Sequence, residues 1–268
     1  MFKNKLALLG AVIIGGLVLT AIFAELIAPY NPLEQNIAQG LRAPNTAHWC
    51  GQDKLGRDLF SRILYGSRIS LWVGISTVSI SLVIGLTIGS ISGFYGGWID
   101  EVFMRIVDIL MAFPGILLAI AMVAVLGPGL NHVILALCLI GWVGYARLVR
   151  AQVLYLREME YVTAAHALGA VPARIIMQHL LPNLIAPVIV EATFGMAGAI
   201  LAEASLSFLG LGAQPPTPSW GSMLNEGRQF LLLAPHHTTF PGLAIMLVVL
   251  GFNFLGDGLR DYLDVKKV

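Results

Sequence analysis

Long apolar stretches, separated by shorter polar ones, fill most of this chain of 268 residues. A helix rises about 1.5 Å per residue, so about 20 apolar residues span the roughly 30 Å of hydrocarbon in a membrane. Six stretches reach that length: residues 6–28, 70–93, 102–126, 131–149, 184–207 and 239–257. The pattern predicts an all-α membrane protein with about six transmembrane helices, most of them in a core that covers residues 70–257.

Two of these assignments depend on how the apolar runs begin and end. Residues 109–146 contain no Asp, Glu, Lys or Arg and are too long for one helix, but the Gly-Pro-Gly turn at 127–129 divides them into two spans. The run within residues 1–28 follows Lys3 and Lys5, as in a signal peptide, yet it is too long for a cleaved apolar segment. We expect it to be retained as the first transmembrane helix.

Composition supports this membrane class and excludes others. Hydrophobic residues make up 57% of the chain and charged residues only 12%, which is too little charge to cover a soluble domain. The formal net charge is +1 and no basic stripe is present, so membrane lipid is an expected partner and nucleic acid is not. Cys50 lies in a polar stretch and Cys138 in an apolar one, which disfavours a disulfide between them.

Basic residues beside the spans predict the orientation in a bacterial inner membrane. With a cytoplasmic N-terminus, ten of the 16 Lys and Arg residues fall on the cytoplasmic side and six fall outside. Cytoplasmic loops are enriched in Lys and Arg, so we expect both termini to be cytoplasmic. Residues 29–69 are then an extracytoplasmic arm, 150–183 a cytoplasmic loop, 208–238 an outer loop and 258–268 a cytoplasmic tail.

The cytoplasmic loop carries the signals of two short helices. Gly169 can take the positive φ that often ends a helix, and Pro172 suits the first turn of the next one. Pro182 is expected to close that second helix before the fifth span begins. Ala164 and Ala165 leave a smooth surface on which another subunit can pack closely.

Five residues of this loop match in type and spacing the EAA loop of ABC importer permeases: Ala164, Ala165, Gly169, Leu181 and Pro182. The chain therefore resembles that family, although Thr163 stands where the family has its glutamate. In the family, this loop is a coupling helix that docks into a cleft of the ATP-binding subunit. The resemblance gives the coupling role to Tyr161, Thr163, Ala164, Ala165, Leu168, Gly169, Pro172, Leu181 and Pro182. Without the resemblance, the same residues also fit a hairpin that only links two spans.

The arm narrows the resemblance to the dipeptide, oligopeptide and nickel permeases of this class. Residues 51–62 are similar to the family signature G-T-D-x-x-G-R-D-x-x-S-R, with Gln52 in place of the threonine. The candidate gate residues of the arm are Gly56, Arg57, Asp58, Ser61, Arg62 and Arg68. This segment is also typical of an interfacial helix whose arginines reach lipid headgroups. We expect a surface helix that also shapes the outer face of the translocation path.

The outer loop is similar to the S-F-L-G-L-G…P-P-x-P-x-W-G segment of the same permeases. Its candidate residues are Gly210, Gly212, Pro215, Pro216 and Trp220. The glycines let the backbone leave the fifth span sharply, and the prolines stiffen an extended segment. Trp220 is expected either in the headgroup belt or in contact with a solute-binding protein.

Carboxylates within the spans are candidates for a polar solute path, because a charge in lipid needs protein or water around it. Glu203 is a possible path-lining residue, whereas for Glu191 we favour a hydrogen bond to a neighbouring helix. His236 and His237 are adjacent but have no third ligand near them in sequence, so no metal site is expected. No G-x-x-x-x-G-K-[ST] phosphate loop and no catalytic triad are found, so this chain is not expected to be an enzyme or to bind a cofactor itself.

The resemblance implies a permease subunit of an ATP-driven importer, in the first place for dipeptides and oligopeptides. Its expected partners are a homologous second permease, two ATP-binding subunits that hold ATP and Mg²⁺, and an extracytoplasmic solute-binding protein. A nickel importer permease is the alternative within this class. A secondary transporter is the alternative outside it, disfavoured because we find no inverted repeat and few intramembrane charges.

Overall fold

The computed structural model describes residues 5–264 and contains helices but no β-strand within that range. Five helical runs are long and apolar enough to cross a membrane, and a bent pair of helices makes a sixth crossing if it counts as one span. The five are α1 (Lys5–Ile22), α3 (Leu59–Tyr95), α6 (Leu130–Leu156), the run Pro172–Phe208 that ends with α9 (Leu181–Phe208), and α11 (His236–Asp264). The all-α membrane fold with about six spans is confirmed.

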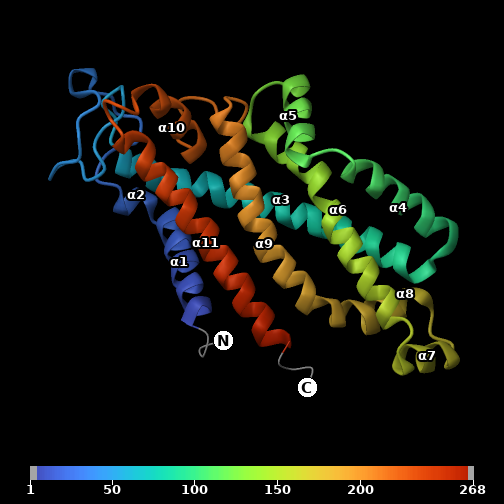
Figure 1. Ribbon diagram of the computed structural model, residues 1–268. Helices are drawn as coiled ribbons and strands as arrows, with labels where there is room; N and C mark the ends of the chain where they lie inside the picture. The colour runs from blue at the N-terminus through green and yellow to red at the C-terminus, as the bar shows by residue number, and fades with distance from the viewer. Residues whose placement is uncertain (1–4, 265–268) are drawn as a thin grey trace.

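Short helices mark the two ends of this bundle (Figure 1). The arm end holds residues 28–58 and the helix α10, and the loop end holds α7 and α8. The first turn of α1 and the last turn of α11 lie on the same side as α7. The short elements are α2 (Ala24–Ile27), η1 (Ile37–Gln39), α7 (Glu160–Ala167), α8 (Pro172–Ile175), η2 (Ile176–Leu180), α10 (Trp220–Gly227) and η3 (Arg228–Phe230).

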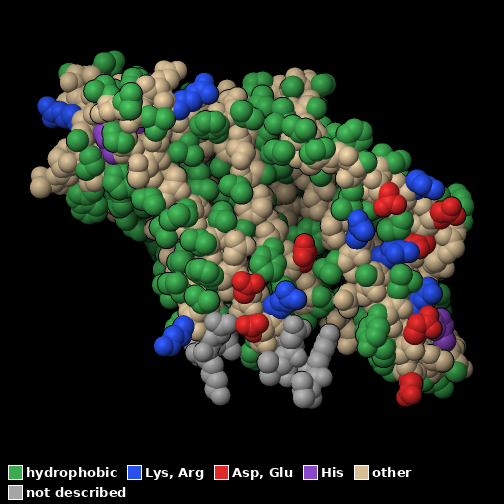
Figure 2. All heavy atoms as spheres, in the orientation of Figure 1, with side chains coloured by type: hydrophobic (Ala, Val, Ile, Leu, Met, Phe, Trp, Pro, Cys, Tyr) green, Lys and Arg blue, Asp and Glu red, His purple; other side chains and the backbone are tan. Residues whose placement is uncertain are grey.

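Charged side chains are distributed as a lipid environment requires. Figure 2 shows them mainly over α4, over α7 and toward the loop end, whereas the middle of this face is mostly hydrophobic or uncharged. Burying a charge in hydrocarbon costs free energy, so the uncharged band suits the part of the bundle that lipid surrounds.

A stripe of glycines brings α3 and α6 together. Gly85, Gly89 and Gly93 follow one another at intervals of four along α3, so they lie on one face of the helix. A Cβ added at Gly89 would lie 2.6 Å from the Ala146 carbonyl oxygen and 2.8 Å from the Val149 Cβ of α6. Only a residue without a side chain allows this approach, as in the small-residue interfaces of membrane helices.

Residues 102–126, predicted as one span, do not form one continuous helix. Two helices, α4 (Gly97–Met111) and α5 (Gly115–Leu126), meet there at an angle of 84°. Pro114 has no N–H to continue the ladder and disfavours helical geometry at the residue before it, which explains the break. The next break was placed correctly, because α5 ends at Leu126 and α6 begins at Leu130, on either side of the Gly-Pro-Gly turn.

The predicted division at residue 70, between the arm and the second span, falls inside a continuous helix. α3 begins at Leu59 and runs without interruption to Tyr95. Asp58 starts it, because its carboxylate accepts a hydrogen bond of 2.7 Å from the Ser61 backbone N–H. The capped start of a long helix therefore lies inside the segment 29–69 that the sequence assigns to the arm.

Pro182 does not end a helix, contrary to expectation. It lies in the first turn of α9, where the missing proline N–H has little effect, and a wide π-turn at Ile176–Leu180 joins α8 to α9. The connection after α6 is also shorter than the loop predicted over residues 150–183, since α6 extends to Leu156. The tail is shorter too, because α11 continues to Asp264; residues 1–4 and 265–268, which include parts of the predicted first span and tail, lie outside the described residues.

Candidate functional site

The turn after α7 has the geometry of a Schellman motif. Gly169 adopts a φ of +80°, its N–H donates to the His166 carbonyl, and the Ala170 N–H donates to the Ala165 carbonyl. Pro172 then occupies the first turn of α8. The local structure predicted for Gly169 and Pro172 is thus confirmed, and the two short helices are held in a fixed relative position.

One face of the α7–α8 segment packs against the spans. Val162 and Ile175 are fully buried and join a cluster with Val149 and Val153 of α6. Ala165 faces the same cluster and only 9% of its surface is exposed. It therefore does not belong to an open docking surface, contrary to the prediction. Stacking of the His166 ring on Phe94 of α3, with ring centroids 5.8 Å apart, adds a further contact. The α7–α8 segment is therefore packed firmly against α3 and α6 and does not merely connect two spans.

The opposite face of the segment is open and largely apolar. Leu168 is 88% exposed and Val171 is 61% exposed, and Tyr161, Thr163 and Ala164 are exposed beside them. Large apolar side chains that a fold leaves uncovered indicate a contact surface. Of the remaining predicted coupling residues, Gly169, Pro172 and Pro182 are exposed and Leu181 is half-buried.

At the arm end, four charged side chains form a buried cluster. Arg57 binds Asp53 at 2.5 Å (Nε–Oδ2) and Glu226 of α10 at 2.7 Å (Nη2–Oε2). Arg62 lies 3.6 Å from the same Asp53 oxygen and 3.7 Å from the same Glu226 oxygen. The two arginine side chains are only 3% and 1% exposed. The expectation that they reach lipid headgroups is therefore wrong: they are neutralised inside the protein and attach the arm to α10.

Other arm residues hold the start of α3 in place. The Asp58 carboxylate accepts hydrogen bonds from the Ser61 hydroxyl at 2.7 Å and from the His48 ring at 2.9 Å. A side chain at Gly56, whose φ is +73°, would overlap the Asn36 backbone. Arg68 lies at the surface and binds Glu25 at 2.9 Å, so it is partly exposed, unlike Arg57 and Arg62. Burial, reinforced by the Asp58 carboxylate, raises the pKa of the nearby Cys50 thiol to about 11.

The outer loop folds back onto the arm end. Gly210 takes a φ of +82° just after α9, as the sharp exit from that span requires. A side chain at Gly212 would overlap Ser207, so the chain passes close to α9 there. Pro215 and Pro216 follow in an exposed segment that leads to α10. Ser219 caps α10 by accepting a hydrogen bond from the Ser222 backbone N–H at 3.2 Å.

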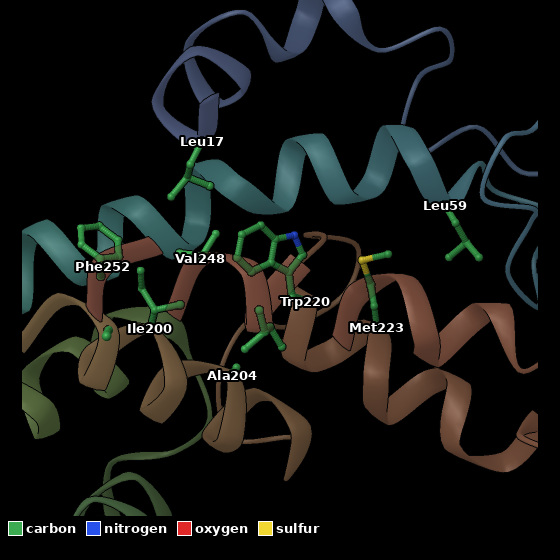
Figure 3. Packing of buried hydrophobic residues seen from close by; sticks show 10 residues of the cluster. Leu17, Leu59, Ile200, Ala204, Trp220, Met223, Val248 and Phe252 are labelled. Carbon is green, nitrogen blue, oxygen red and sulfur yellow. The ribbon is translucent and has the colours of Figure 1, made fainter. Parts of the chain in front are cut away.

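Trp220 is part of the core, and both expectations for it are wrong. It is 2% exposed and lies among side chains from α1, α3, α9, α10 and α11, as Figure 3 shows. Its indole N–H donates to the Ile63 carbonyl at 2.9 Å, and a Cβ at Gly66 would lie 2.8 Å from the same ring. Trp220 thus neither reaches the headgroup belt nor is open to a solute-binding protein; it fastens α10 to α3.

The two carboxylates of α9 have environments opposite to those predicted. Glu203 is fully buried and accepts a hydrogen bond of 2.6 Å from the Ser207 hydroxyl. Glu191 is half-buried and lines a cavity of about 290 Å³ between α3, α6 and α9, which Glu203 does not line. Of the two carboxylates, that of Glu191 is therefore the one beside an open space.

Sequence reasoning missed several residues of these sites. Glu226 has no predicted role, since nothing in the sequence relates it to an arginine 169 positions away. Thr77, Ser81 and Tyr145 line the same cavity as Glu191, yet each lies in an apolar run where a single hydroxyl is unremarkable. A polar residue in a predicted span is the only sequence signal that could have found them.

Comparison with known proteins defines the class. Residues 85–267 match the family model described as "Binding-protein-dependent transport system inner membrane component", and residues 1–44 match the "N-terminal TM domain of oligopeptide transport permease C". A chain of the MetNI methionine ABC transporter in an inward-facing conformation has the same fold, with a TM-score of 0.61 and 21% identity, over 76% of this chain and 97% of that one. The fold and the sequence together define an integral membrane permease of the ABC importer class.

The chain belongs to the family of binding-protein-dependent transport system inner membrane components. A dipeptide transport system permease protein, DppC, from Alkalihalophilus pseudofirmus is 52% identical over 98% of this chain and 87% of that protein. A glutathione transport system permease protein, GsiD, from Pectobacterium atrosepticum is 48% identical over 93% and 83%. As a multi-pass transport permease of a bacterial inner membrane, the chain is not an enzyme.

Proposed function

We propose that this permease carries short peptides across the membrane. The observation that supports this most strongly is the 52% identity, over 98% of the chain, to a dipeptide permease, together with the 48% identity to a glutathione permease. Both named solutes contain a peptide bond, so the shared chemistry is that of a short peptide. Transport assays should pair the complex with its solute-binding protein and compare a labelled dipeptide with Ni²⁺. Uptake of Ni²⁺ but not of the dipeptide would refute the peptide assignment in favour of a nickel importer.

The open face of α7–α8 is proposed as the docking surface for an ATP-binding subunit. Leu168 and Val171 stand out from a segment whose other face is fixed on α6, so force applied there reaches the spans. ATP and Mg²⁺ would bind in the partner, with two ATP-binding subunits and a second permease completing the complex. We place this end of the bundle, and with it both termini, in the cytoplasm.

Matched leucines at the two ends test this docking surface. Leu168→Glu adds a charge to the 88% exposed residue of α7–α8, and Leu232→Glu adds the same charge to a fully exposed residue near the arm end. We expect the first variant to lose the ATP-binding subunit during purification in mild detergent and the second to retain it. Retention by both variants would refute the docking surface.

Matched glycines test the coupling itself. Gly169 and Gly127 both have a positive φ, +80° and +91°, and a Cβ at either would meet nothing within 4 Å. Valine at either position imposes a backbone strain of about 1–3 kcal/mol without a steric clash. Gly169→Val should uncouple ATP hydrolysis from uptake, whereas Gly127→Val should not. Normal coupled uptake by the Gly169 variant would overturn the coupling role.

The arm and the outer loop are proposed to form the extracytoplasmic surface that receives the solute-binding protein. The buried cluster of Arg57, Arg62, Asp53 and Glu226 joins these two segments into one platform. Cysteines introduced singly at Leu168 and Leu232 of a cysteine-free variant test the orientation. An impermeant maleimide added to intact cells should label position 232 only; labelling of position 168 only would reverse the topology.

A further inference from the structure

The cavity beside Glu191 lies within the spans and combines a mainly apolar wall with a few polar side chains. It has a volume of about 290 Å³ and is lined by residues of α3, α5, α6 and α9. Glycines and aliphatic side chains form most of its wall, and four polar side chains, those of Thr77, Ser81, Tyr145 and Glu191, complete it. Among residues 5–264, no Lys or Arg side chain lines it.

Three hydroxyls at this cavity have no hydrogen-bond partner within the described part of the chain. Thr77, Ser81 and Tyr145 are 5%, 1% and 5% exposed, and the hydroxyl oxygen of each lacks a hydrogen bond to any of the described residues. A buried hydroxyl without a hydrogen bond costs free energy, so native proteins rarely keep one unless a ligand, water or partner meets it. Three such groups at one cavity indicate a site built for a polar occupant.

Glu191 adds a negative charge to these hydroxyls. It lies ten positions after the start of α9, which places it about 15 Å along the helix, away from either end of the span. Among the ion pairs formed by residues 5–264, none includes Glu191. An ionisable side chain at this depth that faces a cavity indicates a solute path. Because Glu191 is a carboxylate, the group that would pair with it carries a positive charge.

Glycines keep this space open. A Cβ at Gly195 would collide with the Tyr145 hydroxyl, and a Cβ at Gly141 would lie 2.6 Å from the Ser81 hydroxyl. Gly144 and Gly198 are exposed and face the cavity with nothing within 4 Å of an added Cβ. The cavity therefore has room at Gly144 and Gly198 for a group of moderate size, on the side that the single chain leaves uncovered.

We propose that this cavity is a transit subsite for the N-terminal ammonium group of a peptide, with Glu191 as its counter-charge. An ammonium group offers three N–H donors, and a carboxylate with neighbouring hydroxyls supplies acceptors for all of them. Hydroxyl groups that the ammonium group does not use form hydrogen bonds with the first peptide bond of the solute. This inference rests on the peptide function proposed above, and it names the part of the solute that this chain itself recognises.

A zero-length cross-link tests the contact directly. A membrane-permeant carbodiimide joins a carboxylate to an amine as an amide and takes up the water that is lost. The full importer complex, in phosphatidylcholine vesicles without amine lipids, is treated in the presence of a labelled dipeptide, and mass spectrometry locates the adduct. We expect an adduct on Glu191 with the dipeptide and little with ethanolamine at equal concentration. Equal coupling of ethanolamine would show an accessible carboxylate without a peptide site and would overturn the proposal.

Uptake by matched variants tests the role in transport. With saturating loaded binding protein, Glu191→Gln should lower the maximal rate by about tenfold or more, the loss expected for one charge-assisted hydrogen bond, and leave KM unchanged. Gly198→Leu should act similarly by filling the space, whereas Glu203→Gln, a change to the other carboxylate of α9, should retain the rate. An unchanged rate for Glu191→Gln would overturn the subsite and leave the peptide function intact.

Two further outcomes are distinguishable from that one. If Glu191→Gln separates from the second permease during size-exclusion chromatography, Glu191 is a contact between permeases and the subsite is refuted. If the unmodified complex moves no dipeptide at all, the peptide function itself fails and the subsite falls with it.

Discussion

Replacing Glu226 with Gln should destabilise the arm end by about 3 kcal/mol. Two arginines, 3% and 1% exposed, share two carboxylates there, of which Asp53 is fully buried and Glu226 is 17% exposed. Removing the charge of Glu226 leaves two buried guanidinium groups with a single counter-charge. Breaking a buried ion pair on one side costs about 3–5 kcal/mol, and the partial exposure of Glu226 puts this change at the lower limit.

The ion pair of Arg157 with Glu158 supplies a matched control. Its Nε–Oε1 distance is 3.0 Å, close to the 2.7 Å between Arg57 and Glu226, but its side chains are 35% and 73% exposed. Exposed pairs contribute about 0–1 kcal/mol, so Glu158→Gln should change stability little. The two variants therefore compare burial at nearly constant geometry.

Unfolding in mixed micelles, titrated with dodecyl sulfate and followed by circular dichroism, measures both free energies. The midpoint should move clearly to lower denaturant for Glu226→Gln and remain in place for Glu158→Gln. Equal shifts for the two variants would refute the reasoning, because they would show that the buried cluster is no more important than a surface pair.

Three other changes probe the packing and the arm. Gly89→Val should cost about 1–3 kcal/mol or more, because its side chain must displace the α6 backbone, whereas Gly16→Val in α1, where a Cβ meets nothing within 4 Å, should be nearly neutral in the same titration. Trp220→Ala should cost about 3–5 kcal/mol through the cavity it leaves, and Trp220→Phe should cost only about 1–2 kcal/mol for the lost indole hydrogen bond; similar losses for both would contradict this assignment. The Cys50 thiol, with a pKa of about 11, is almost entirely protonated at pH 7, so its rate of maleimide labelling should rise about tenfold per pH unit up to pH 10; a rate that levels off near pH 9 would show an ordinary thiol.

Local signals in the sequence predicted the features that depend on a few neighbouring residues. The Gly-Pro-Gly turn, the positive φ of Gly169 and the place of Pro172 all follow from backbone chemistry that acts within three or four positions. The bend at Pro114 has an equally local cause, but the apolar run around it hid the break, because hydropathy does not distinguish one span from two half-spans.

Contacts between distant segments could not be predicted in this way. The indole of Trp220 binds a carbonyl 157 positions away, and Arg57 binds a carboxylate 169 positions away. Judged from the sequence alone, a tryptophan in a Pro-rich loop and an arginine in a polar arm are both expected at the surface. Their burial results from how α3 and α10 pack, and one sequence contains no record of that packing.

Pro172–Phe208 is one continuous helical run. It connects the exposed loop, through Glu191, to the exit into the outer loop. The π-turn at Ile176–Leu180 loosens its ladder near the loop end, so the run can bend there. The 28 residues of α9 beyond it form a lever about 42 Å long, and a tilt of roughly 5° about the turn moves its far end by about 4 Å. The loop lies close to the turn, so it moves by less than one bond length during this tilt. The far end of α9 moves by a distance comparable to the width of a peptide backbone.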